Sequence, residues 1–255
     1  MGPTTKSISV TGGVTFDQLA ESYREQALGL IEGGVDVLLL ETVQDTINVK
    51  AGLEGIDQAM AELVERFYGL HLPHTATAFE ALVLAVLGQQ ISTSVARIIR
   101  TLLIETFGPN AEFDGETYYA FPRPESIWAS SPAELHTMKL TQRKSEYVHG
   151  LAGSALDAAV GLDRLGELTD AEIVAKLTAL RGVGLWTAQW TLIRAVGRFD
   201  ALPLGDLALR RVVSRLFTDG AEVTDSDVED IAQRWSPYRT FATVYLFSAL
   251  RTGAG

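Results

Sequence analysis

The chain has 255 residues, with 32 acidic against 21 basic side chains and a formal net charge of −11. Hydrophobic residues make up 47% and charged residues 21%, which is ordinary globular usage and excludes wholesale disorder. Cysteine is absent, which excludes disulfides, a thiolate nucleophile, cysteine-ligated zinc and an iron–sulfur cluster. No apolar run reaches the roughly 18 residues of a membrane span, and the N-terminus lacks a signal-peptide pattern. We therefore expect a soluble cytoplasmic protein with no membrane partner.

The charge is unevenly distributed along the chain. Residues 1–55 hold three basic against eight acidic residues, whereas the window 181–215 holds six arginines against Asp200 and Asp206. A strongly acidic protein is a poor match for nucleic acid, because phosphate binding needs basic surface. A local basic face can still bind phosphate. The window 181–215 is therefore either such a face or an ordinary solvated helix surface.

The first 55 residues are predicted to form a helix, a strand and the start of a second helix. Thr15 and Gln18 have the spacing of a capping box, and apolar residues then recur at helical spacing over 16–32. The run 35–40 is typical of a buried parallel strand. The stretches GPTTKSIS and REQALGLIEGGVDVLLLETVQDT resemble part of the homocysteine-binding barrel domain of cobalamin-dependent methionine synthases. A closed barrel needs eight strands, and the zinc-binding cysteines of that family are absent. We interpret residues 1–55 as a fused, non-catalytic α/β fragment; a homocysteine-linked methyltransferase remnant is the alternative.

Residues 56–255 are predicted to form a second domain that is almost entirely helical. Apolar residues recur at helical spacing, and glycine, proline, asparagine and aspartate gather between the helical stretches. One longer stretch of this kind, 108–124, is predicted as a loop. The expected helices cover residues 48–67, 79–87, 92–107, a short segment after the Ser131 N-cap, and 142–158, 171–180, 185–196, 207–217, 224–235 and 237–250.

Two sites in this helical part have residue types suited to chemistry. The turn Leu180-Arg181-Gly182-Val183-Gly184 joins two short helices, and its glycines allow backbone amides to point outward and bind a phosphodiester. Many helix pairs use glycine only to turn, so a structural role stays open. Asp206 is at the predicted start of a helix that also carries Arg210 and Arg211. It is either a common N-cap or a catalytic carboxylate at the mouth of a cleft.

Five motifs in residues 56–250 together resemble the helix-hairpin-helix DNA glycosylases, most closely the 3-methyladenine DNA glycosylase II branch. The resemblance implies a mainly α fold with two helical lobes flanking a DNA-binding cleft. The motifs occur in order as FEALVLAVLGQQIS (79–92), MKLTQRKSEYV (138–148), LRGVGLWTAQW (180–190), LPLGDLALRR (202–211) and RWSPYRTFATVYLF (234–247).

The same resemblance implies a role for each matching residue. Asp206 falls on the family's catalytic aspartate, and Trp186, Trp190 and Tyr238 fall on positions that line its base pocket. Gln90 falls in the loop that enters the duplex. The backbone carbonyls of Thr178, Leu180 and Val183 fall where relatives often bind sodium or potassium, and no other cofactor is expected. Contacts to DNA are implied for Gln89, Gln90, Ile91, Arg181, Gly182, Val183, Gly184 and Arg210.

Taken together, these residues predict a monofunctional DNA glycosylase of base excision repair. It would flip an alkylated purine, such as 3-methyladenine or 7-methylguanine, out of damaged double-stranded DNA and hydrolyse the N-glycosidic bond. The cationic base would stack on electron-rich rings, while Asp206 stabilises the charge that develops on the sugar. Trp186 stands where bifunctional relatives carry a Schiff-base lysine, so lyase activity is not expected. A glycosylase for deaminated or oxidised purines and a non-catalytic DNA-binding module are the alternatives. We expect a nucleoid-associated monomer, with self-association through residues 1–55 as the alternative.

Overall fold

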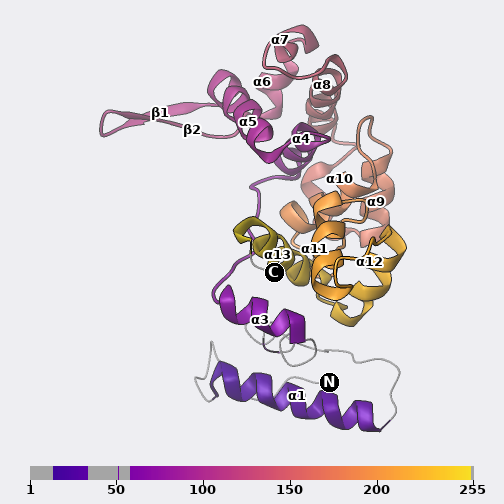
Figure 1. The fold of residues 1–255 in the computed structure, drawn as a ribbon. Coiled ribbons are helices and arrows are strands. Elements are labelled where there is room, and N and C mark those ends of the chain that lie inside the picture. Colours follow the sequence, from indigo (N-terminus) through magenta and orange to yellow (C-terminus); the bar gives the residue numbers. More distant parts are fainter. Residues whose placement is uncertain (1–13, 34–50, 52–57, 254–255) are drawn as a thin grey trace. The chain divides into compact units, whose positions relative to one another are not determined.

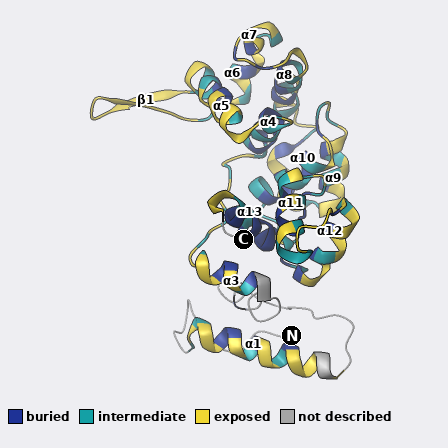
Figure 2. Cartoon of the chain, viewed as in Figure 1, coloured by how far each residue is buried: buried dark blue, intermediate teal, exposed yellow. Residues whose placement is uncertain are grey.

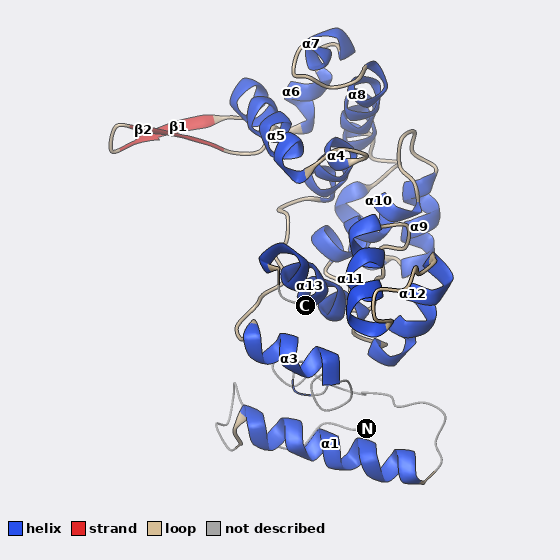
Figure 3. Cartoon of the chain, in the orientation of Figure 1, coloured by secondary structure: helices blue, strands red, loops and turns tan. Residues whose placement is uncertain are grey.

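A computed structural model describes residues 14–33, 51 and 58–253 of the chain. The chain divides into two compact units, unit 1 with residues 1–72 and 198–255 and unit 2 with residues 73–197. Both units are mainly helical (Figures 1 and 3), which confirms the predicted fold class. None of the described helices is long and apolar enough to cross a bilayer. The predicted strand 35–40, the start of the helix predicted over 48–67 and the domain boundary at residue 55 lie outside the described residues.

Unit 1 is built around a core that draws on both ends of the chain. Leu19 and Tyr23 of the first helix are fully buried in one cluster with Met60, Val213 and Trp235. The predicted capping box is present, since Thr15 and Gln18 exchange backbone-to-side-chain hydrogen bonds. The first helix therefore belongs to the core of this unit. The helical elements are α1 (Phe16–Glu32), α3 (Gln58–Arg66), α11 (Leu207–Phe217), α12 (Asp225–Ala232), the 3₁₀ turn η3 (Gln233–Trp235) and α13 (Arg239–Thr252).

Unit 2 packs its other helices around an apolar helix, α4 (Ala78–Gly88) (Figure 2). Helix α4 is buried along most of its length and packs against α5, α8 and α10. Serine or threonine N-caps begin five of the helices of this unit, which explains why their starts are set locally. The other elements are α5 (Thr93–Phe107), α6 (Pro124–Trp128), α7 (Pro132–His136), α8 (Gln142–Leu156), η1 (Leu162–Glu167), α9 (Asp170–Thr178), α10 (Leu185–Thr191) and the π-helical turn η2 (Leu192–Val196).

The loop predicted for residues 108–124 is wrong over much of its length. Strands β1 (Asn110–Phe113) and β2 (Glu116–Tyr119) form an antiparallel hairpin that extends from the helices of unit 2 (Figure 3). Asp114 and Gly115 both have positive φ, of 51° and 77°, as a two-residue type I′ turn requires. The Asp-Gly pair is a hairpin signal that the abundance of loop-forming residues concealed.

The start of the last helix also differs from the prediction. Helix α13 begins at Arg239, because Tyr238 has non-helical backbone angles and the Arg239 N–H donates to the Asp200 carboxylate. A carboxylate that accepts the first helical N–H acts as a cap, here supplied from a distant part of the sequence. Pro237 precedes the helix, and its peptide bond with Ser236 is cis.

Replacing Leu19 with alanine should destabilise the protein by about 2–5 kcal/mol, because a large side chain is removed from a closed core. Leu28 is the matched control on the same helix, where 54% of the side chain is exposed and alanine should change stability by less than about 0.5 kcal/mol. Urea unfolding of the full chain measures both. Equal, small effects would show that α1 does not contribute to the core.

Candidate functional site

The predicted hairpin between α9 and α10 is present in unit 2. The Leu180 carbonyl accepts the Val183 N–H at 3.1 Å, which closes the turn, and Gly184 is the N-cap of α10 in an extended conformation. Val183 is buried, whereas Gly184 is exposed. The turn therefore buries the Val183 side chain and leaves Gly184 at the surface.

Gly182 cannot be another residue in this turn without rearrangement. Its φ is +89°, a region that L-residues with a Cβ rarely adopt. An added Cβ would lie 2.4 Å from Cγ of Tyr147, so the Tyr147 ring fills the space beside the backbone. Arg181 lies over the same ring and forms an ion pair with Glu146 at 2.8 Å. The Arg181 side chain is 74% exposed, and exposed pairs of this kind contribute little to stability, so its guanidinium can exchange partners.

The loop after α4 contacts the hairpin through the Gln89 side chain. Its Nε2 donates to the Gly182 carbonyl at 3.2 Å and to the Thr187 hydroxyl at 3.1 Å. Gln90 is exposed with a left-handed φ of 56°, and Ile91 is half-buried beside it. Of the three residues predicted to contact DNA from this loop, Gln90 is thus the most exposed, while the Gln89 amide is engaged within unit 2.

Trp186 and Trp190 are one helical turn apart on α10. Their rings make an edge-to-face contact with 6.3 Å between centroids, and both side chains are half-buried. Such contacts fix ring orientation at a typical gain of about 0.5–1.5 kcal/mol. The structure therefore brings together two of the three residues predicted for the base pocket.

Asp206 begins α11 in unit 1, where it is half-buried. Its Oδ1 accepts hydrogen bonds from the Ala208 N–H at 2.9 Å and the Leu209 N–H at 3.2 Å. The capping role considered from sequence is therefore real. This capping is compatible with a catalytic role. The two hydrogen bonds from backbone amides hold the carboxylate in a fixed direction at a helix N-terminus, where a negative charge is favoured.

Tyr238 lies in an aromatic cluster of unit 1 and is only 5% exposed. Its ring is 6.5 Å from Phe199 and 6.4 Å from Phe241, and Phe199 itself is 46% exposed. Burial raises the pKa of the Tyr23 phenol on α1, and Tyr238 raises it further by a charge interaction. Phe199 was not among the predicted site residues, although it adjoins the motif that contains Asp206.

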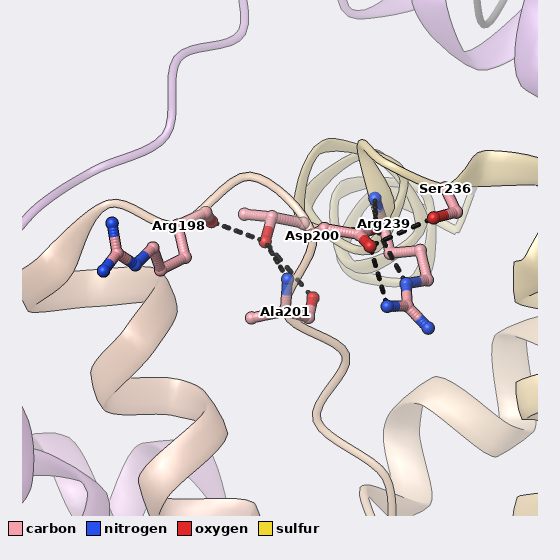
Figure 4. A network of polar contacts seen from close by, with 6 residues as sticks. Arg198, Asp200, Ala201, Ser236 and Arg239 are labelled. Atoms are coloured by element: carbon pink, nitrogen blue, oxygen red, sulfur yellow. Dashed lines mark hydrogen bonds and ion pairs between the residues drawn. The ribbon is translucent and has the colours of Figure 1, made fainter. Parts of the chain in front are cut away.

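A polar network that the sequence did not reveal holds the segment before Asp206 (Figure 4). Arg239 donates to both carboxylate oxygens of Asp200, at 2.8 and 2.7 Å, and Ser236 donates to the same carboxylate. Thr240 donates to the Arg198 carbonyl and accepts the Ala201 N–H. Bidentate arginine–carboxylate pairs are geometrically specific. The network therefore fixes the segment that leads to Asp206 against the start of α13.

The remaining predicted residues have ordinary partners. Arg210 lies 3.5 Å from the Asp225 carboxylate. Among the three carbonyls predicted to bind a cation, that of Leu180 also accepts the Val183 N–H. The Thr178 hydroxyl donates to the Val174 carbonyl within its own helix.

A family model described as HhH-GPD superfamily base excision DNA repair protein matches residues 83–237, more than half of the chain. The chain belongs to this superfamily. Among its relatives, DNA-3-methyladenine glycosylase from Bacillus subtilis is 31% identical over 72% of this chain and 61% of its own length. DNA-3-methyladenine glycosylase 2 from Escherichia coli is 24% identical over 91% of this chain and 88% of its own length. The structure of 3-methyladenine DNA-glycosylase from Archaeoglobus fulgidus is 30% identical, with a TM-score of 0.73 over 79% of this chain and 68% of that one.

The HhH-GPD match does not extend to the N-terminus. A second family model, homocysteine S-methyltransferase, matches residues 1–110. This match confirms the resemblance stated for the first 55 residues and extends it into the helical part of unit 2. The match between this chain and the B. subtilis glycosylase covers less than two thirds of the length of that glycosylase.

Replacing Gly182 with alanine should destabilise this HhH-GPD protein by about 2 kcal/mol or more, since left-handed strain and overpacking against Tyr147 add together. Gly184 is the matched control, because no atom lies within 4 Å of an added Cβ and its φ is −99°. Alanine at residue 184 should leave stability unchanged or slightly raised. Thermal unfolding compares the two variants, and equal melting temperatures would contradict the described turn.

Proposed function

We propose that this protein is a monofunctional DNA glycosylase that removes alkylated purines such as 3-methyladenine and 7-methylguanine from double-stranded DNA in the cytoplasm. The observation that carries the proposal is the family match over residues 83–237, which contains both the hairpin and Asp206. The names of the B. subtilis and E. coli relatives support the choice of an alkylated purine.

The arrangement of the hairpin supports a role in holding DNA. A damaged nucleotide must leave the stack before its bond to the sugar can be reached, at a cost of a few kcal/mol. Phosphate contacts offset that cost. The exposed Gly184 at the start of α10 leaves room for a phosphate beside the backbone amides, and the exposed Arg181 supplies positive charge.

Asp206 is proposed to carry the chemistry. As the N-glycosidic bond breaks, its electron pair leaves with the base and positive charge develops on the sugar. A carboxylate held by two amide hydrogen bonds stabilises that charge without reorganising. It also orients a water molecule, whose oxygen bonds to the sugar carbon while one of its protons passes to the Asp206 carboxylate and from there to solvent. The products are the free base and an abasic site.

Electron-rich rings are proposed to select the substrate. Alkylation at N3 or N7 makes the purine cationic, and a cation is attracted to an aromatic face by about 0.5–2 kcal/mol. Trp186 and Trp190 supply such rings in unit 2, and Tyr238 with the partly exposed Phe199 supplies them in unit 1. A cationic base is a good leaving group, so the reaction needs no strong general acid.

The carbonyls of Thr178, Leu180 and Val183 are proposed to hold sodium or potassium. Neutral backbone carbonyls are suitable ligands for a monovalent cation. The Val183 N–H that the Leu180 carbonyl accepts occupies one of two lone pairs, so the donor set fits. When bound, the ion would add positive charge beside a DNA phosphate.

Replacing Asp206 with asparagine should lower the rate of base release by about 100-fold or more, because the carboxylate charge is lost. Asparagine is as good an N-cap as aspartate, so the melting temperature and affinity for DNA should change little. Single-turnover release of 7-methylguanine from a methylated duplex measures the rate.

The matched control for this variant is Asp219→Asn, which removes the same charge at an exposed, left-handed position just after α11. It should retain the wild-type rate. A fully active Asp206→Asn variant would overturn the mechanism. DNA binding without release of alkylated, deaminated or oxidised bases by the wild type would instead favour a non-catalytic DNA-binding module.

The abasic product should remain uncleaved at neutral pH, because Trp186 has no amine to form a Schiff base with the opened sugar. A labelled duplex analysed on a denaturing gel should show strand breaks only after hot alkali. Borohydride should trap no covalent complex. Strand cleavage before the alkali step would show lyase activity and contradict the monofunctional assignment.

A further inference from the structure

The loop between α4 and α5 has a conformation that its own sequence does not enforce. Residues 88–92 leave the helix through Gln90, whose left-handed φ of 56° is uncommon for a residue other than glycine. Gln90 is exposed, so no core contact of its side chain explains this backbone. The constraint must come from the groups that hold the residues around it.

Lys144 of α8 provides the first of these constraints. Its Nζ donates to the Leu87 carbonyl at 2.9 Å and to the Gln89 carbonyl at 2.6 Å. These are carbonyls at the C-terminal end of α4, where a positive charge is favoured. Lys144 is half-buried, and this burial lowers the pKa of its ammonium group. The ammonium group is therefore turned toward the protein.

Gln89 provides the second constraint. While its backbone carbonyl accepts from Lys144, its side-chain amide donates to Gly182 of the hairpin and to Thr187 of α10. The loop is thus tied to the turn that is proposed to hold phosphate, through contacts between residues more than 90 positions apart in the sequence. Both constraints meet at the residue that precedes Gln90.

We propose that Lys144 and Gln89 are positioning residues that hold the exposed Gln90 loop at a fixed place relative to the hairpin, so that both elements engage the same duplex together. The proposal rests on the proposed function in that the loop fills the gap left by an extruded nucleotide. Ordering a loop before binding lowers the entropy that binding must offset. Without the lysine, the loop must be ordered during binding.

Lys144→Met is the variant that tests this role, since methionine keeps much of the apolar stem and removes the donor. Two readouts are compared with the wild type. The first is the affinity for a duplex with a tetrahydrofuran abasic-site analogue relative to an intact duplex. This preference should fall about tenfold or more, because the variant removes both charge-assisted hydrogen bonds that Lys144 makes to the loop. The second is hydrogen exchange of the 88–92 amides in the free protein, which should become faster.

Lys176→Met is the matched control. Lys176 also donates from Nζ to a backbone carbonyl in unit 2, that of Val160 at 2.7 Å, which is not part of the 88–92 loop. It should leave both readouts unchanged. Lys144→Arg should restore most of the preference for the abasic duplex, because guanidinium can donate to both carbonyls. If Lys144→Met does not fold, Lys144→Gln replaces it and should retain an intermediate preference.

The outcomes separate this proposal from the proposed function. A folded Lys144→Met protein with an unchanged preference overturns the positioning role, even if its melting temperature falls. A wild type that shows no preference for the abasic duplex overturns it as well. If the wild type releases no base yet its preference for the abasic duplex falls in the variant, the positioning role stands and the glycosylase assignment fails.

Discussion

The close approach of the Tyr147 ring to Gly182 is the constraint on which the candidate site in unit 2 depends. The ring takes the space of a side chain, which leaves the backbone of the turn to be held by its neighbours. Arg181 lies over the same ring, and the Gly182 carbonyl accepts from Gln89. A turn formed in this way presents its second glycine and an arginine at the surface while its centre stays rigid, which suits the binding of a phosphate backbone.

In unit 1, an ion pair rather than close packing holds the backbone of the candidate site in place. The Asp200–Arg239 pair joins the segment before Asp206 to the first turn of α13, and Thr240 adds further hydrogen bonds to the backbone of Arg198, Phe199 and Ala201. Asp206 is then held by amides of its own helix. Because two amides of α11 cap its side chain and the backbone before it is held, Asp206 has little freedom to turn, which suits the electrostatic role proposed for it.

Features set by neighbouring residues were predictable from the sequence. The bounds of α11, the capping box at Thr15 and the N-cap at Ser131 depend on contacts within one helical turn, and all are present. The β hairpin was missed because its Asp-Gly turn lies in a stretch whose composition favours loop. The start of α13 was misplaced because its cap comes from Asp200, 39 positions earlier.

The same division applies to the candidate site. Motifs located Asp206 and the hairpin glycines, since these residues are recognised by their immediate neighbours. The partners that orient them could not be predicted from the sequence, because Lys144, Gln89 and Arg239 act through contacts between distant parts of the chain. The sequence shows that these side chains carry a charge or an amide, but it does not show which groups they face. Whether Lys144 faces solvent or the carbonyls of α4 is decided only by folding.

The burial of α1 in the core of unit 1 has a consequence for the abundance of the folded protein in a cell. Leu19 and Tyr23 come from a segment related to another enzyme family, yet they lie in one cluster with residues of α11 and with Trp235. Damage to that segment would act on abundance, because chaperones and proteases remove chains whose core is incomplete. The proposed release of damaged bases would then decline, although the residues proposed to carry it are intact.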